Sequence, residues 1–242
     1  MTEYIDRLYR HLMKPAGLVA FVVKIKESDL MIYAQFDLSE IAYSVLDRER
    51  RNLEAYIRYQ PNFKKSLIPI TVADFAPQIC KLMAGTAFRA KVGPMAAVAG
   101  AVNDRLADEL FPKSQELIIE NGGDLLIHSL KARTIAIYAG ENTPFQSHLG
   151  LRVFPGKTWG VATSSGQIGP SLSFGKADAV TVVAESSALA DAWATSIGNQ
   201  VKTKKDVEKV LSFCENIHDI IGVVIVFQDI LGVRGDIQLV RL

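Results

Sequence analysis

The chain has 242 residues, of which 49% are hydrophobic and 22% are charged, and this balance is ordinary for a globular protein with a sizeable core. The formal net charge of +1 excludes the basic surface that marks proteins binding nucleic acid or anionic membranes. No apolar run reaches the length of a membrane span. Cys80 and Cys214 have no metal-binding spacing and lie in apolar helical patterns, so both are expected to be buried thiols. We therefore expect a cytoplasmic protein with a single domain over residues 1–242, and neither nucleic acid nor membrane among its partners.

Hydrophobic patterns in the first part of the chain predict a β-hairpin followed by helices. In chain order the expected elements are a polar helix or arm at 3–12, strands at 18–25 and 30–36, a helix from 37 to 59, a linker or edge strand at 67–70, and a helix at 76–90. Asp37, with Glu40 three residues later, has the spacing of a capping box, and Pro61 ends the helix that this box begins.

The next segment, residues 93–104, is the stretch around which we expect the rest of the chain to be organised. Pro94 suits the first position of a helix, because its φ is already helical and its missing N–H would have no partner there. Residues 96–101 are almost all small, which lets another backbone come close. We therefore predict a buried central helix that ends at Pro112.

The second half of the chain is rich in predicted strands. These lie at 116–120, 124–127, 132–138, 149–154, 159–162 and 179–184, with helices at 186–197 and 204–217 and a closing antiparallel pair at 220–227 and 235–240 around Gly232. A mixed sheet with helices between its strands indicates an α+β or α/β fold.

Asn121-Gly122-Gly123-Asp124 lies between two of these predicted strands. One interpretation is a hairpin turn, because Asn-Gly tolerates positive φ at both central positions. The other is a close approach of the backbone to a ligand, which glycine permits. The sequence leaves both interpretations open.

Thr163-Ser164-Ser165-Gly166 begins a long polar loop. Backbone amides and hydroxyls at this density can hold a phosphate or a carbonyl-rich ring. The loop lacks the Gly-Lys-Ser/Thr ending of a Walker loop, and a mobile polar loop is the alternative interpretation.

Asp191 and Thr195 are four residues apart on a predicted helix, so their side chains lie on one face. A carboxylate and a hydroxyl are hard oxygen ligands of the kind that Mg²⁺ prefers, with substrate phosphates and water completing the coordination. A solvated polar face is the alternative. The histidines are dispersed and show no metal-binding spacing.

These motifs, in this order, resemble those of the ApbE-like flavin transferases, which move FMN from FAD onto a Thr or Ser of a target protein with the help of Mg²⁺. The sequence also looks like an uncharacterised bacterial and archaeal offshoot of that superfamily. The segments that carry this likeness are 92–101, 120–124, 163–166, 173–179 and 190–195.

The resemblance implies an α+β fold of the ApbE type, with a mainly antiparallel sheet packed with helices and a ligand cleft between two halves. It implies Mg²⁺ at Asp191 and Thr195, and a protein acceptor as a further partner. It also implies a bound nucleotide such as FAD, held by Asn121, Gly122, Gly123, Asp124, Thr163, Ser164, Ser165 and Gly166.

The chain departs from the transferase pattern at two places. The lysine of the transferase helix is Ala99 here, and residues 171–176 replace a His-x-x-Asp-Pro segment. Lys176 and Asp178 are then candidate catalytic residues, with Asp124 of the turn as an alternative, since acid–base chemistry needs a titratable group near the reacting atom. We expect Mg²⁺-dependent binding of FAD or a related nucleotide, with transferase activity and binding without catalysis both open. A third alternative, in which the motifs serve only packing, is disfavoured because Asp191 and Thr195 are present.

Overall fold

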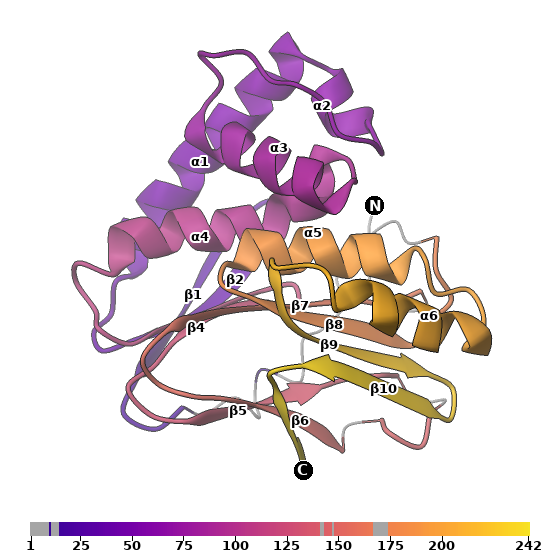
Figure 1. Cartoon of the computed structure of the whole chain (residues 1–242). Coiled ribbons are helices and arrows are strands. Elements are labelled where there is room, and N and C mark those ends of the chain that lie inside the picture. The colour runs from indigo at the N-terminus through magenta and orange to yellow at the C-terminus, as the bar shows by residue number, and fades with distance from the viewer. Residues whose placement is uncertain (1–9, 11–14, 141–142, 147, 167–173) are drawn as a thin grey trace.

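An antiparallel sheet of eight strands runs through the middle of the molecule (Figure 1). The computed structural model describes residues 10, 15–140, 143–146, 148–166 and 174–242. The strands, in their order across the sheet, are β1 Val19–Ile25, β2 Ser28–Ala34, β3 Leu117–Asn121, β4 Asp124–His128, β7 Thr158–Ser164, β8 Ala179–Ala184, β9 Ile220–Phe227 and β10 Ile230–Gly235. A smaller sheet lies against one face of the large sheet and consists of β11 Gln238–Arg241, β6 Leu149–Val153 and β5 Arg133–Ile137.

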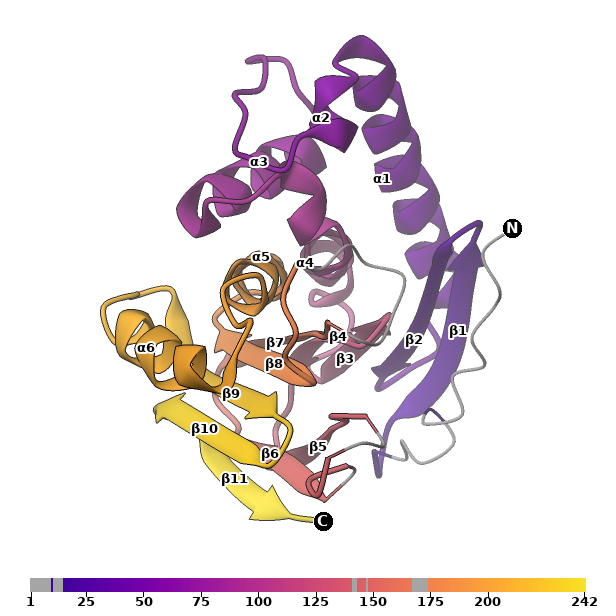
Figure 2. The same cartoon turned by 90° about the vertical axis from the view of Figure 1, so that its right-hand side faces the viewer.

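Helices lie on the other side of the large sheet (Figures 1 and 2). They are α1 Ser39–Tyr59, α2 Asn62–Lys65, α3 Gln78–Ala90, α4 Val98–Leu110, α5 Ser187–Gly198 and α6 Lys204–Cys214, with a 3-10 turn at Pro94–Ala97 before α4. Of these, α2 and α3 pack mainly on other helices and not on the sheet. Among the described residues, no helix is both long enough and apolar enough to cross a membrane.

Strand β8 shows why the sheet needs cover on both faces. All six of its residues are buried. Val180 and Val182 pack on the helix side, whereas Val183 packs with Leu151 and Val153 of the small sheet. A run of β-branched residues buried on both faces produces the continuous apolar pattern that the sequence shows here.

The predicted central helix is present as the 3-10 turn and α4, and it is packed against α5 at very short range. A Cβ atom built on Gly100 would lie 2.2 Å from the carbonyl oxygen of Ser187, and one built on Gly160 of β7 would lie 2.1 Å from that of Ser186. Because only glycine fits at both points, the start of α5 sits tightly between α4 and β7.

The expected pairing at the C-terminus is wrong. Strand β9 pairs with β10, which the sequence analysis missed, and β11 pairs with β6 in the small sheet. The reason lies at Gly235, whose φ of 102° redirects the chain out of the large sheet after its last ladder position, opposite Gly222.

Three local expectations also need comment. Residues 67–70 form neither strand nor helix. The expected capping box does not form at the start of α1. Asp37 accepts a hydrogen bond from the Ser39 N–H, but the N-cap position is Leu38, which makes no side-chain cap. The predicted arm at 3–12 lies outside the described residues except for Arg10.

Both cysteines are buried, free thiols, as the sequence predicts. Burial raises the pKa of Cys80 to about 12 and that of Cys214 to about 11. Both thiols are therefore neutral at physiological pH and behave as small apolar core residues.

Gly100→Ala tests the close packing of α4 on α5. We expect a loss of about 1–3 kcal/mol of unfolding free energy, because the added methyl group overlaps the Ser187 backbone. Gly85→Ala is the matched control, since Gly85 is an exposed residue of α3 where an added Cβ would meet nothing within 4 Å. That change is expected to stabilise the helix by about 0.5–1 kcal/mol. Urea denaturation of both variants gives the answer, and a Gly100→Ala protein as stable as the parent contradicts the packing.

Candidate functional site

Helices α4 and α5 cap each other's N-termini through aspartate side chains, and this contact is the framework of the candidate site. Asp191 of α5 accepts a hydrogen bond from the Gly100 N–H at 3.0 Å and another from the Ala99 N–H. Asp104 of α4 accepts hydrogen bonds from the Ser187 and Ala188 N–H groups at 2.9 and 3.0 Å. Each carboxylate therefore satisfies N–H groups that a helix leaves unpaired in its first turn.

Two asparagines connect α4 to the sheet below it. The Asn121 side chain at the end of β3 donates to the Ala99 carbonyl at 3.2 Å. Asn103, which is fully buried, donates to the Asp124 carbonyl at 3.2 Å and to the Ser187 hydroxyl at 3.1 Å. Three of the sequence motifs that stand apart in the chain therefore meet at the start of α4.

The turn at Gly122 and Gly123 is a two-residue hairpin connection. Asn121 and Asp124 are paired across it, and the two glycines have φ values of 69° and 101°. The hairpin interpretation of this motif is confirmed. A Cβ on Gly123 would meet nothing within 4 Å, so positive φ rather than crowding by the described chain requires glycine there.

Three aspartates near this point have unusual pKa values. Burial raises the pKa of Asp191 to about 7 and that of Asp104 to about 6. Burial, and then the charge of Asp191, raise the pKa of Asp124 well above its usual range. Each of these three residues is partly exposed, and burial is nevertheless the largest of the effects that raise the three pKa values. The charged forms are stabilised mainly by backbone N–H groups, including that of Thr163 for Asp124.

The other predicted ligand-binding residues lie along β7 and α5. Thr195 is one turn beyond Asp191 and partly buried. Ser164 ends β7 below the last turn of α5, where a Cβ on Gly198 would come within 3.1 Å of its hydroxyl oxygen. The structure thus places Ser164 on the helix side of the sheet.

Thr163 contributes its backbone rather than its hydroxyl to this face. Its hydroxyl shares a hydrogen bond of 2.9 Å with Thr181. The neighbouring β7 residues Trp159 and Val161 pack on the small-sheet side, and residues two apart on a strand face the same way. The strand period was the signal that could have separated Thr163 from Ser164.

The two candidate catalytic residues follow residues 167–173, which lie outside the described residues. Lys176 is exposed, and its backbone N–H donates to the Val201 carbonyl at 2.8 Å. Asp178 is buried and accepts the N–H of Gln228 in the turn between β9 and β10. Gly166 donates its N–H to the Ala177 carbonyl at 3.0 Å, so the two ends of the polar loop are held together. The catalytic roles of Lys176 and Asp178 stay predictions.

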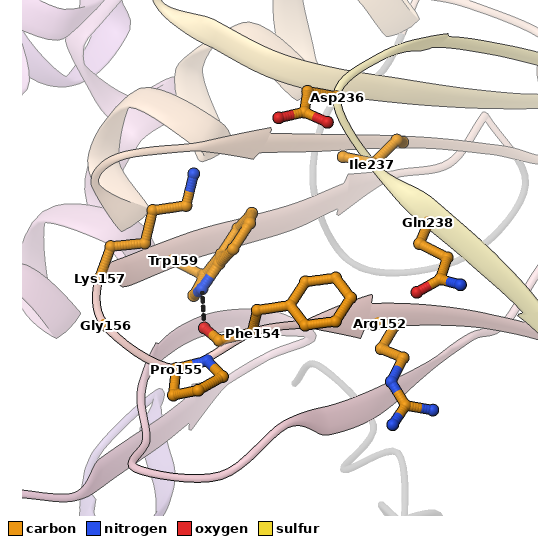
Figure 3. A pocket seen from close by; sticks show the side chains of 9 residues that line it. All are labelled: Arg152, Phe154, Pro155, Gly156, Lys157, Trp159, Asp236, Ile237 and Gln238. Atoms are coloured by element: carbon orange, nitrogen blue, oxygen red, sulfur yellow. Dashed lines mark hydrogen bonds between the residues drawn. The ribbon is translucent and has the colours of Figure 1, made fainter.

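Two pockets open at the far ends of β4 and β7, away from the Asn121–Asp124 turn and the contact between α4 and α5. One, of about 390 Å³, lies between the sheets (Figure 3), where the Trp159 indole donates to the Phe154 carbonyl at 2.8 Å and the Lys157 ammonium lies 4.1 Å from the centre of the indole. The other, of about 480 Å³, includes His128 and Thr158. Neither coincides with the predicted ligand cleft, which stays a prediction.

The small-residue helix, the Asn-Gly-Gly-Asp turn and the aspartate-bearing helix all lie in a part of the chain that matches a known family. Residues 10–219 match the family described as AbpE bacteria. The chain belongs to this family. The UPF0280 protein of Methanococcus vannielii is 41% identical over 222 residues, which cover 89% of this chain and 90% of that protein.

Solved structures confirm that the chain has an ApbE-like α+β fold. The ApbE protein of Thermotoga maritima superposes with a TM-score of 0.59 at 13% identity, covering 90% of this chain and 97% of that one. The flavinyl transferase ApbE of Pseudomonas stutzeri superposes with a TM-score of 0.55 at 16% identity, covering 90% and 93%. At such low identity the likeness establishes the fold alone.

The raised pKa values predict how stability depends on pH. Between the ordinary aspartate value of 3.8 and about 7, Asp191 keeps its proton in the folded state but loses it when unfolded. Unfolding then releases protons, so the metal-free protein is expected to become less stable as pH rises through this window. Asp104, with a pKa of about 6, adds to the same trend.

Asp191→Asn is expected to flatten this pH dependence, because the amide keeps an oxygen for the Gly100 N–H but does not titrate. Thermal denaturation at pH 5.0 and pH 7.5 in the presence of a chelator measures it. Asp74→Asn, at an exposed position, is the control and should leave the slope unchanged. The same slope in Asp191→Asn and its parent would remove Asp191 as a titrating group in this range.

Proposed function

We propose that this protein binds Mg²⁺ together with FAD or a related nucleotide. The site would lie at the ends of the central strands β3 and β4, where the start of α4, the Asn121–Asp124 turn and Asp191 meet. The observation that carries the proposal is the pair formed by Asp124 and Asp191. The charge of Asp191 disfavours ionisation of Asp124, and burial raises the pKa of both carboxyl groups. A divalent cation beside them would let both ionise, because an opposite charge favours the charged form.

The donor set fits Mg²⁺. Asp191 and Thr195 lie on one face of α5, and Asp124 offers a further carboxylate oxygen from β4. Among the described residues, no group of three or more His, Cys, Asp or Glu side chains is arranged to hold a metal. That agrees with Mg²⁺, which usually takes one or two carboxylates and leaves its remaining positions to water and substrate phosphates. When bound, the ion would stabilise negative charge on phosphate oxygens.

The nucleotide would be held by groups that surround this metal position. Ser164 faces α5 from the end of β7, and Ser165 and Gly166 follow it in the chain. The exposed turn at Gly122 and Gly123 lies at the same end of these strands. The fold shared with a flavinyl transferase supports FAD as the first nucleotide to test.

Ala99 bears on whether the site is catalytic. It stands where the transferase pattern has a lysine, and it offers only its backbone, with its N–H directed to Asp191 and its carbonyl to Asn121. A methyl side chain supplies neither a proton nor a positive charge. This observation favours the second candidate function, a flavin- or nucleotide-binding protein without catalysis, unless another residue such as Lys176 supplies the charge.

Isothermal titration calorimetry with FAD, in the presence and absence of Mg²⁺, tests the binding proposal. We expect FAD affinity to depend on Mg²⁺ and Asp191→Asn to weaken it by about tenfold or more, since even residues behind metal ligands carry effects of this size. The Asn side chain keeps an oxygen for the Gly100 N–H, so this part of the helix cap is retained while the charge is lost. Equal affinities for the variant and its parent would remove Asp191 from the site.

Flavin transfer to an acceptor protein is expected to be absent. The reason is the missing lysine at Ala99, because transfer of a phosphoryl-type group depends on cations that stabilise charge on phosphate oxygens. The protein is incubated with FAD, Mg²⁺ and a threonine-bearing acceptor domain, and the acceptor is examined for in-gel fluorescence and for the mass of FMN. A flavinylated acceptor would overturn this expectation, and loss of that activity in Lys176→Ala would identify the compensating cation.

A further inference from the structure

A buried group of charges lies behind the Asn121–Asp124 turn and includes a residue from the start of the chain. The Arg10 side chain is only 9% exposed, and the side chains of Asp29 and Glu120 are 6% and 2% exposed. Its guanidinium donates to Asp29 Oδ1 at 2.6 Å, to the Asp29 carbonyl at 2.8 Å and to Glu120 Oε2 at 2.6 Å. We refer to Arg10, Asp29 and Glu120 as the Arg10 clamp.

The clamp is connected directly to the turn. Glu120 uses Oε2 for Arg10, and its other oxygen, Oε1, accepts the Gly123 N–H at 2.9 Å. Gly123 is followed by Asp124, whose pKa is raised by the charge of Asp191 and whose backbone carbonyl accepts a hydrogen bond from Asn103 at 3.2 Å. One glutamate therefore joins a residue near the N-terminus to the backbone of the turn that carries Asp124.

Arginine is suited to this position because its planar fork can serve two acceptors at once. Burial alone would lower the pKa of Arg10, but the hydrogen bond to Asp29 and the charge of Glu120 raise it overall. Without Arg10, Glu120 Oε2 would lose the guanidinium that it now accepts from, and a buried carboxylate that loses such a contact tends to turn toward water. Such a movement would change how Glu120 holds Gly123.

We propose that Arg10 is a positioning residue for the candidate site: through Glu120 it fixes the turn at Gly122 and Gly123 and so directs Asp124 toward Asp191. The part of this inference that concerns metal binding rests on the proposed function, whereas the fixing of the turn does not. Arg10 itself touches neither metal nor nucleotide in this scheme.

The chain contains a matched control for the clamp. Arg133 and Glu116 form another buried arginine–glutamate pair, with side chains 14% and 9% exposed and a contact of 3.1 Å. Glu116 immediately precedes β3, whereas Glu120 lies near its other end. Arg133→Ala therefore breaks a comparable pair next to the opposite end of β3, away from the turn.

The test compares Arg10→Ala, Arg10→Lys and Arg133→Ala in the full chain. Amide hydrogen exchange at Gly123, followed by NMR without metal, reports on the turn, and Mn²⁺ affinity measured by electron paramagnetic resonance reports on the site. For Arg10→Ala we expect exchange at Gly123 to be about tenfold faster and Mn²⁺ binding to be about tenfold weaker. Arg10→Lys should restore these values only in part, because an ammonium lacks the fork. Arg133→Ala should lower the melting temperature and change neither readout.

The outcomes separate the two proposals. Equal Gly123 exchange in Arg10→Ala and Arg133→Ala, with similar losses in melting temperature, overturns the positioning role and leaves a structural one. Faster exchange only in Arg10→Ala, with no Mn²⁺ binding by the parent protein, supports the clamp and contradicts the proposed function. If Arg10→Ala does not fold, Glu120→Gln decides, because it keeps an oxygen for Gly123 but loses the charge that pairs with Arg10. Parental exchange in Glu120→Gln would then overturn the inference.

Discussion

The reciprocal capping of α4 and α5 is the constraint on which the rest of the site depends. Asp104 and Asp191 each bind N–H groups at the start of the other helix. These hydrogen bonds can form because Gly100 has no side chain, so the backbone of α5 at Ser187 can approach the backbone of α4 closely. Asn103 and Asn121 then attach the β3–β4 turn to this helix pair, so moving the helices apart would break the contacts that hold α4, α5 and the turn together.

This arrangement shifts the pKa of Asp191 in two opposite directions. The N–H groups of α4 favour the carboxylate, as a helix N-terminus does for any anion. Burial and the nearby charge of Asp104 favour the neutral acid. The pKa of about 7 is the sum of these opposing effects, and under the proposed function a bound cation would favour the carboxylate.

The sequence predicted those features that depend on local pattern. The hairpin of β1 and β2, the long helix α1 and the small-residue helix follow from periodicity and composition. The partition of strands between two sheets was not predictable in this way, because periodicity does not identify a partner, and β11 was misassigned for that reason. The Arg10 clamp left no local signal either, since Arg10 and Glu120 are 110 positions apart in the chain. The turn glycines were recognised, but only the register of Asn121 with Asp124 could distinguish the two interpretations.

The strand order of the two sheets has a consequence for how the chain can assemble during synthesis. The large sheet follows the order of the chain across its whole width, so each of its strands can pair with one that has already been made as the polypeptide emerges. The small sheet cannot be completed in the same way. Its strand β11 follows every strand of the large sheet in the chain and pairs with β6, so the side of β6 that awaits it stays an open edge until residues 238–241 have been made. Until then that edge is open to mispairing with other chains.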